Sequence, residues 1–275
     1  MLFDVLLAGE LFWSIPLLIG LVCIVGLYTF LIRRFTNIKL FHKQPLLFFL
    51  GLILLYFVTG SPLYTISHLS FSTHMLQMSI LYFIIPPIIL LGIPGLFFQR
   101  IENVFMIKGV RILLVTPKMA LIVFAVLFFL YHLPFVLNVI SLNSFLHNGY
   151  ILVLFGLAFI MWWPLVTSYT EKYRCGKEKK HYAFLSGLIL MPACLIFIVN
   201  ALFDGAQNPL LHQFTAQLCL PSQTDSLSLL PWPFNSKFDQ VIAGALMLGM
   251  HKFGLMLSLR LGDTSKIQTV LERKI

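Results

Sequence analysis

The chain contains 275 residues, of which 59% are hydrophobic and only 11% are charged. Soluble domains carry about 25% charged residues, so this composition excludes an ordinary soluble globular protein and indicates an integral membrane protein. The formal net charge of +9 raises the question of nucleic-acid binding, but the basic residues are concentrated beside apolar stretches, which is typical of contact with anionic lipid. We therefore expect membrane lipids, and no nucleic acid, as partners.

Seven apolar stretches are each long enough to cross a bilayer. A helix of about 20 residues spans the hydrocarbon layer of roughly 30 Å at about 1.5 Å per residue, and backbone groups within lipid must bond inside their own segment. We predict an all-α integral membrane protein, a bundle of seven transmembrane helices in a single domain that covers residues 1–275. The predicted spans are about 11–32, 45–66, 75–98, 119–140, 147–167, 183–203 and 239–259.

Basic residues alternate along these stretches in a way that predicts orientation. The first, third and fifth connections and the C-terminal tail hold four, four, five and four of the 19 Lys and Arg residues, whereas the other connections and the N-terminus hold only Lys237. Positively charged connections stay in the cytoplasm. The N-terminus is therefore expected outside and the C-terminus in the cytoplasm.

Two features interrupt the pattern of helices and short connections. Pro86 and Pro87 lie in the middle of the third stretch, where their missing backbone donors predict a kink or a break. The long connection 204–238 is expected outside the membrane. It combines four prolines with large apolar residues, so we expect part of it to lie at the outer interface.

Histidine and methionine gather near the outer ends of the predicted helices. His74 and Met78 are at positions i and i+4 and share one helix face, and imidazole with thioether is a donor set suited to Cu(I). His132 and His147 are expected at a similar level on other helices. A single histidine more often caps a helix or contacts water, and a single methionine more often packs. Together, however, His74, Met78, His132 and His147 are the candidate copper ligands.

Asp204 and Asp239 flank the long outside connection. They are candidates to hydrogen-bond metal-ligating imidazoles, although marking the ends of helices is the favoured interpretation. A haem is also compatible with the sequence, because His74 and His132 lie on different helices at comparable depth.

The chain carries no signature of an enzyme. HExxH, GxSxG and P-loop motifs do not occur, and we expect no catalytic activity. No carboxylate lies deep in a predicted span, which argues against a proton-coupled carrier. Met247 and His251 repeat the i, i+4 spacing in the seventh span.

Several runs of the sequence resemble one known family. The run SFSTHMLQMSILYFIIPPIILLGIPG at 70–95 resembles the hallmark segment of the CtaG family of bacterial membrane proteins, and FFLYHLPFVLN at 128–138 resembles its fourth-span motif. WWP at 162–164, LMPACLIF at 190–197 and DQVIAGALM at 239–247 are also similar. The resemblance implies a multi-pass cell-membrane factor for assembly of cytochrome c oxidase, notably of the caa type, with oxidase subunits as partners.

The resemblance also bears on the candidate residues. It supports His74, His132 and Asp239, which fall within the matching runs. The family run is commonly HMLQH, so Met78 replaces a histidine here, although a thioether still suits Cu(I). The family further implies copper centres toward the outer side of the oxidase, which favours Cu(I) handling at the extracytoplasmic face.

Two other functions stay open at the level of sequence. A metal-free scaffold would hold an oxidase subunit through helix contacts within the membrane. A copper permease is less favoured, because polar residues are sparse along the inner halves of the predicted spans.

Overall fold

The chain folds as a bundle of helices. The computed structural model describes residues 13–36, 38–67, 70–95, 97, 116–133, 136, 139–140, 142–166, 176–202 and 236–272. No strand occurs within these ranges, which confirms the predicted all-α class. The helices are α2 (Ile15–Phe35), α3 (Lys43–Gly60), α4 (Leu63–Ser67), α5 (Phe71–Ser79), the π-helix η1 (Ile80–Ile84), α6 (Ile85–Gly92), α8 (Pro117–Tyr131), α10 (Ser144–Val166), α11 (Gly176–Leu202) and α13 (Ser236–Glu272).

In the described part of the chain, five helices are long and apolar enough to cross a membrane. They are Ile15–Phe35, Lys43–Gly60, Phe71–Gly92, Ser144–Val166 and Phe238–Gly262. The two other predicted spans coincide with α8, which has 15 residues, and with α11, which has 27 and begins with a charged turn. A helix therefore occupies each predicted stretch, while the number of helices that cross the membrane and their orientation stay predictions.

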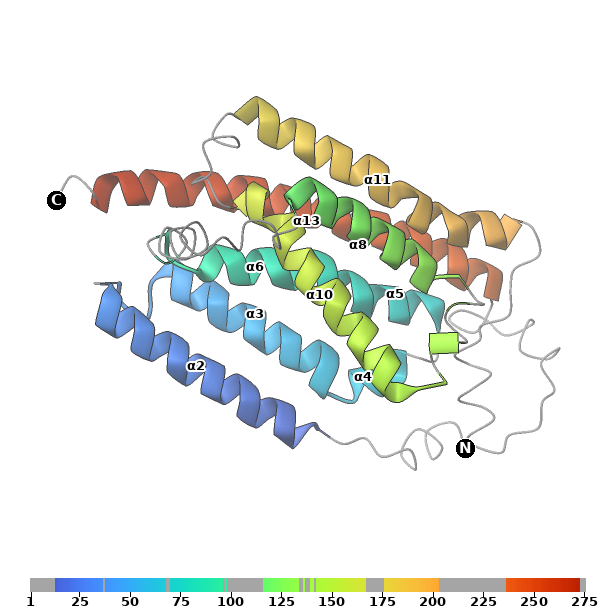
Figure 1. The fold of residues 1–275 in the computed structure, drawn as a ribbon, viewed down its shortest axis with the longest axis horizontal. Helices are drawn as coiled ribbons and strands as arrows, with labels where there is room; N and C mark the ends of the chain where they lie inside the picture. The colour runs from blue at the N-terminus through green and yellow to red at the C-terminus, as the bar shows by residue number, and fades with distance from the viewer. Residues whose placement is uncertain are drawn as a thin grey trace.

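The continuous helix formed by α5, η1 and α6 lies at the centre of the bundle (Figure 1). Its most apolar segment is 89% buried, compared with 17% for that of α2. A helix that is apolar on all sides is stable when other helices cover it, and α3, α10 and α13 pack against this one. The α2 helix packs on α3 at the edge of the bundle, and α11 packs on α13 and α8.

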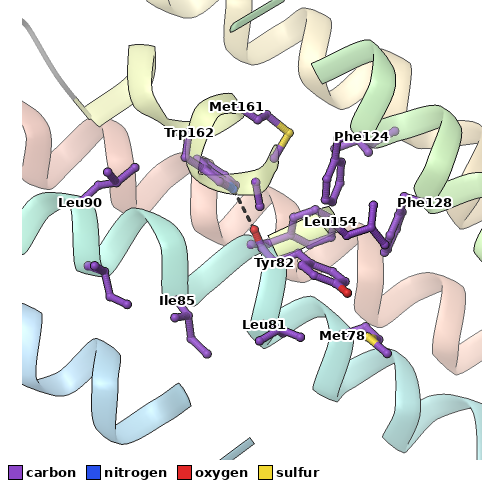
Figure 2. Close-up of a cluster of buried hydrophobic side chains, with 14 of the residues drawn as sticks. Met78, Leu81, Tyr82, Ile85, Leu90, Phe124, Phe128, Leu154, Met161 and Trp162 are labelled. Carbon is purple, nitrogen blue, oxygen red and sulfur yellow. Dashed lines mark hydrogen bonds between the residues drawn. The ribbon is translucent and has the colours of Figure 1, made fainter. Parts of the chain in front are cut away.

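The two prolines of the third stretch follow the π-helical segment η1. Proline has no N–H, so Pro86 and Pro87 cannot donate to the carbonyl groups of Tyr82 and Phe83, four residues earlier. The Tyr82 carbonyl instead accepts a hydrogen bond from Trp162 Nε1 of α10 at 2.9 Å (Figure 2). The chain thus accommodates its prolines by a change of helix type, supported from a neighbouring helix.

Contacts between helix ends show how the chain alternates in direction. At one end of the bundle, Asp239 at the start of α13 binds the start of α5. At the opposite end, the Tyr28 hydroxyl of α2 donates to the Gly92 carbonyl at the end of α6 at 2.6 Å, and Lys179 Nζ at the start of α11 donates to the Leu165 carbonyl near the end of α10 at 3.0 Å. The basic residues at the end of α2 and at the starts of α3 and α11 therefore lie at one end of the bundle, and the start of α5, which carries His74, lies at the other (Figure 1).

Candidate metal-binding site

The first turn of α5, which carries His74, is held by a buried carboxylate from α13. Asp239 Oδ1 accepts hydrogen bonds from the Ser70 hydroxyl and the Ser72 N–H, both at 3.0 Å. Its other oxygen accepts the Phe71 N–H. A negative charge is favourable at a helix N-terminus, where backbone N–H groups have no helical partner. This contact fixes the position of α5, and hence of His74, relative to α13.

Of the two acidic residues predicted to hydrogen-bond a metal-ligating imidazole, the structure describes only Asp239. Among the described residues, the Asp239 carboxylate contacts the N-terminus of α5 rather than an imidazole. Its part in holding α5 is therefore clear, whereas direct orientation of a ligand stays a prediction. Asp204 lies outside the described residues.

Gln77 ties α5 to the two preceding helices. Its Oε1 accepts a hydrogen bond from the Ser67 hydroxyl of α4, and its Nε2 donates to the Val58 carbonyl of α3 at 2.9 Å. A buried amide whose donor and acceptor are both satisfied specifies one arrangement of the groups around it. Gln77 therefore fixes the rotation of α5, and with it the direction in which His74 and Met78 point.

Tyr131, the last residue of α8, lies among the three candidate histidines. Its ring centroid is 6.1 Å from that of His74 in α5, 5.4 Å from that of His132 and 6.0 Å from that of His147 in α10. Its hydroxyl oxygen is 3.1 Å from His147 Nε2. The fold thus brings the predicted histidines from three segments of the chain around one phenol.

The hydrogen bond of His132 determines its tautomer. Nδ1 lies 2.5 Å from the Phe128 carbonyl oxygen, and a carbonyl oxygen only accepts, so Nδ1 carries the proton. Nε2 then bears the lone pair that can bind a metal ion. Because His132 is buried, an ion held at Nε2 would be shielded from water.

Met78 is buried and lies one turn after His74 on the central helix. Two ring contacts bracket it: His74 packs on Tyr131, and Tyr82, one turn further along, packs on Phe128 of α8 at 5.8 Å (Figure 2). The Met78 thioether is therefore level with the last turn of α8, which precedes His132. We refer to His74, Met78, Tyr131, His132 and His147 as the outer cluster.

The outer cluster combines two kinds of neutral donor, imidazole and thioether. In the part of the chain that the structure describes, no three His, Cys, Asp or Glu side chains form a group that could hold a metal ion, whereas structural zinc sites use four such ligands. Cu(I) accepts soft donors such as thioether and imidazole. Candidate ligands His74, Met78 and His132 supply these two donor types.

Sequence reasoning identified the histidines but missed Tyr131. This tyrosine directly precedes His132 in the run YHLPF, at the end of an apolar helix. Its contacts with His74 and His147 depend on how α5, α8 and α10 pack. The sequence signal was therefore its position beside a candidate ligand, and nothing local revealed its central place.

These observations define a helical membrane protein with a cluster of imidazoles, two of them buried, at one end of its bundle. Residues 26–260 match the model of a protein family described as cytochrome c oxidase caa3 assembly factor. The match covers most of the chain, so the chain belongs to this family, and the resemblance noted in the sequence is confirmed. Comparison with curated proteins and with solved structures gave no match.

Proposed function

We propose that this chain assists the assembly of a cytochrome c oxidase in the cell membrane by binding Cu(I) at the extracytoplasmic end of its bundle. The observation that carries the proposal is the outer cluster, in which histidines from three segments surround Tyr131. Because the chain belongs to an oxidase assembly family, the proposed recipient of the copper is a cytochrome c oxidase. The role is to bind and deliver, without catalysis.

The outer cluster suits a cargo ion that must leave again. Its donors are neutral imidazole and thioether groups, which bind Cu(I) without an anionic ligand. Few ligands and moderate affinity allow transfer by ligand exchange, in which an incoming donor from the acceptor replaces His74 or His132. Asp239 and Gln77 keep α5 in place during the exchange, since both anchor it to other helices.

The acceptor in this proposal is an oxidase subunit that docks sideways within the membrane. The α2 helix is suited to lipid or helix contacts, because it is largely unburied and carries large apolar side chains such as Val22, Leu27 and Phe30 on its surface. Contact between apolar helices in lipid depends on packing. Lateral docking would bring a copper-accepting subunit beside the bundle without a soluble intermediate.

Copper binding by the purified chain tests this proposal. The full chain is purified in detergent with its cysteines changed to alanine, and bound Cu(I) is counted by competition with a Cu(I)-specific chelator. We expect His74→Ala and His132→Ala each to weaken Cu(I) binding at the outer cluster at least tenfold, because each variant removes one of the small number of donor groups. His181→Ala is the matched control, since His181 is exposed at the opposite end of the bundle. Equal binding by all three variants would remove the outer cluster from the proposal.

The second candidate is a metal-free scaffold for an oxidase subunit. It is favoured by one observation: among the described residues, no three strong ligands converge on one point. It differs from copper handling in what His74→Ala does to the cell. A scaffold predicts normal oxidase activity with this variant and reduced activity when α2 is altered, whereas copper handling predicts that His74→Ala lowers oxidase activity and that added copper partly restores it.

A further inference from the structure

A second histidine–methionine pair lies deeper in the bundle and takes no part in the outer cluster. Met247 and His251 are one helical turn apart in α13 and share a face. Both are buried, with exposed fractions of 0% and 4%. Side chains in a helix lean toward its N-terminus, so helix geometry directs the His251 side chain toward the turn that carries Met247.

Aromatic rings enclose His251. Its ring centroid lies 5.0 Å from that of Phe83 in η1 and 5.9 Å from that of Trp162 in α10. Within the described residues, buried His251 Nε2 has no hydrogen-bond partner, and the Trp162 indole N–H is taken by the Tyr82 carbonyl. Buried polar atoms nearly always have a partner, which can be a water molecule or an ion. A water molecule or an ion is therefore expected at Nε2, because the described side chains around it provide no hydrogen-bond partner.

Two contacts place this pair relative to the outer cluster. Asp239 bonds to the start of α5, and a side chain at Gly254 would collide with a carbonyl oxygen of η1. The α13 helix therefore runs parallel to the central helix and close to it. At about 1.5 Å per residue, Met247 lies about 12 Å and His251 about 18 Å along α13 from Asp239. Met247 is thus level with Met78, and His251 lies one turn further into the bundle.

The chemistry of the pair favours a soft monovalent ion. Imidazole nitrogen and thioether sulfur are neutral donors, and Cu(I) binds such soft ligands. A divalent ion held by these two donors would bring a double charge into an apolar interior without an anionic ligand, which is strongly unfavourable. The neighbouring Trp162 ring adds a π face, which attracts cations.

We propose that Met247 and His251 form a second Cu(I)-binding site, the inner site, between α13 and η1. The proposal rests on the proposed function for the identity of the ion. One chain would then carry two Cu(I) ions, one at the outer cluster and one about a helical turn deeper.

The variants are chosen to remove donors without disturbing the core. The parent is the full chain with Cys23, Cys175, Cys194 and Cys219 changed to alanine, so that thiols do not bind the ion.

In this parent, Met247→Leu removes the sulfur at nearly constant volume, and His251→Gln removes the imidazole. Met256→Leu changes an exposed methionine of the same helix, and His181→Gln changes an exposed histidine at the opposite end. These two are the matched controls.

The measurement counts Cu(I) bound per chain in detergent, without oxygen, against a Cu(I)-specific chelator. We expect two ions for the parent and the controls, and one ion for Met247→Leu and for His251→Gln. In a parent that also carries His74→Ala and His132→Ala, the remaining ion should show sulfur scattering in its X-ray absorption spectrum. Met247→Leu should then abolish that signal. Unchanged copper content in folded Met247→Leu and His251→Gln, as expected if a water molecule partners Nε2, would overturn the inner site.

Failure of the inner site and failure of the proposed function give different results. If only the outer cluster binds copper, the parent holds one ion. The double variant His74→Ala, His132→Ala then loses this ion, whereas Met247→Leu retains it, and the inner site is overturned. If only the inner site binds, the parent holds one ion that Met247→Leu loses and the outer variants keep. That result would support the inner site and would refute the proposed binding of copper at the outer cluster. A parent that binds no Cu(I) overturns both.

Discussion

At the scale of single residues, the Asp239 carboxylate decides how firmly the outer cluster is held. It is buried and accepts three hydrogen bonds from the start of α5. Asp239→Asn would point an amide donor at backbone N–H groups and remove the charge that the helix terminus favours. We predict a loss of about 1–3 kcal/mol in stability, measured as a lower thermal unfolding midpoint of the purified chain in detergent.

The control for this prediction is Glu178→Gln. It removes the same charge from an exposed position in the first turn of α11. Because hydration weakens the effect of that charge on the helix terminus, Glu178→Gln should lower the midpoint much less than Asp239→Asn. If Asp239→Asn unfolds at the temperature of the control, the carboxylate contributes nothing to holding α5.

The same residues show how far the sequence could predict the site. His74, His132 and His147 were expected at one end because helix length and the alternating basic connections fix the end of the bundle that each residue occupies. The contacts of Tyr131 and Asp239 were not predictable, because they depend on which helices become neighbours. Asp239 is 168 positions from Phe71 in sequence, and no periodicity links positions so far apart.

At the scale of helices, the predicted elements were recovered because each is a long apolar stretch bounded by polar or charged residues. The form of the central helix was harder to predict. Its prolines indicated a distortion, but a π-helical segment requires partners for the carbonyl groups that proline leaves unpaired. For the Tyr82 carbonyl that partner is the Trp162 N–H of α10, and only the tertiary structure identifies it.

The hydrogen bond from Trp162 to the Tyr82 carbonyl makes a prediction about η1. Trp162→Phe keeps an aromatic ring but removes the N–H, and Pro86 cannot replace it as a donor. We expect a loss of about 1–3 kcal/mol in stability, measured as a lower thermal unfolding midpoint. Trp13→Phe, at an exposed position that stacks on Tyr56, is the control and should change the midpoint little.

A double-mutant cycle separates this hydrogen bond from the loss of ring volume. Pro86→Ala restores a backbone N–H four residues after Tyr82, which can donate to its carbonyl in an α-helical pattern. Pro86→Ala should therefore be better tolerated in the Trp162→Phe chain than in the unmodified chain. Additive effects of the two changes would show that the indole N–H does not support η1.

At the scale of the whole molecule, the two ends of the bundle differ in chemistry: one carries the candidate ligands and the other carries basic residues. Candidate ligands gather where α5 and α10 begin and where α8 ends. The basic residues at the end of α2 and at the starts of α3 and α11 lie at the other end (Figure 1). Anionic lipid at the cytoplasmic surface attracts lysine and arginine. The orientation of the bundle therefore decides whether the outer cluster meets the side of the membrane that the proposed function requires.

Cysteine labelling of intact cells tests this orientation. In the cysteine-free chain, Lys177→Cys places a thiol at the exposed start of α11, and Leu142→Cys places one at an exposed position just before α10. The charge pattern puts Lys177 in the cytoplasm, so a membrane-impermeant maleimide should label Leu142→Cys in intact cells and Lys177→Cys only after lysis. Labelling of both after lysis controls for accessibility. The reverse pattern in intact cells would place the outer cluster in the cytoplasm, where it could not deliver copper to the extracytoplasmic side of an oxidase.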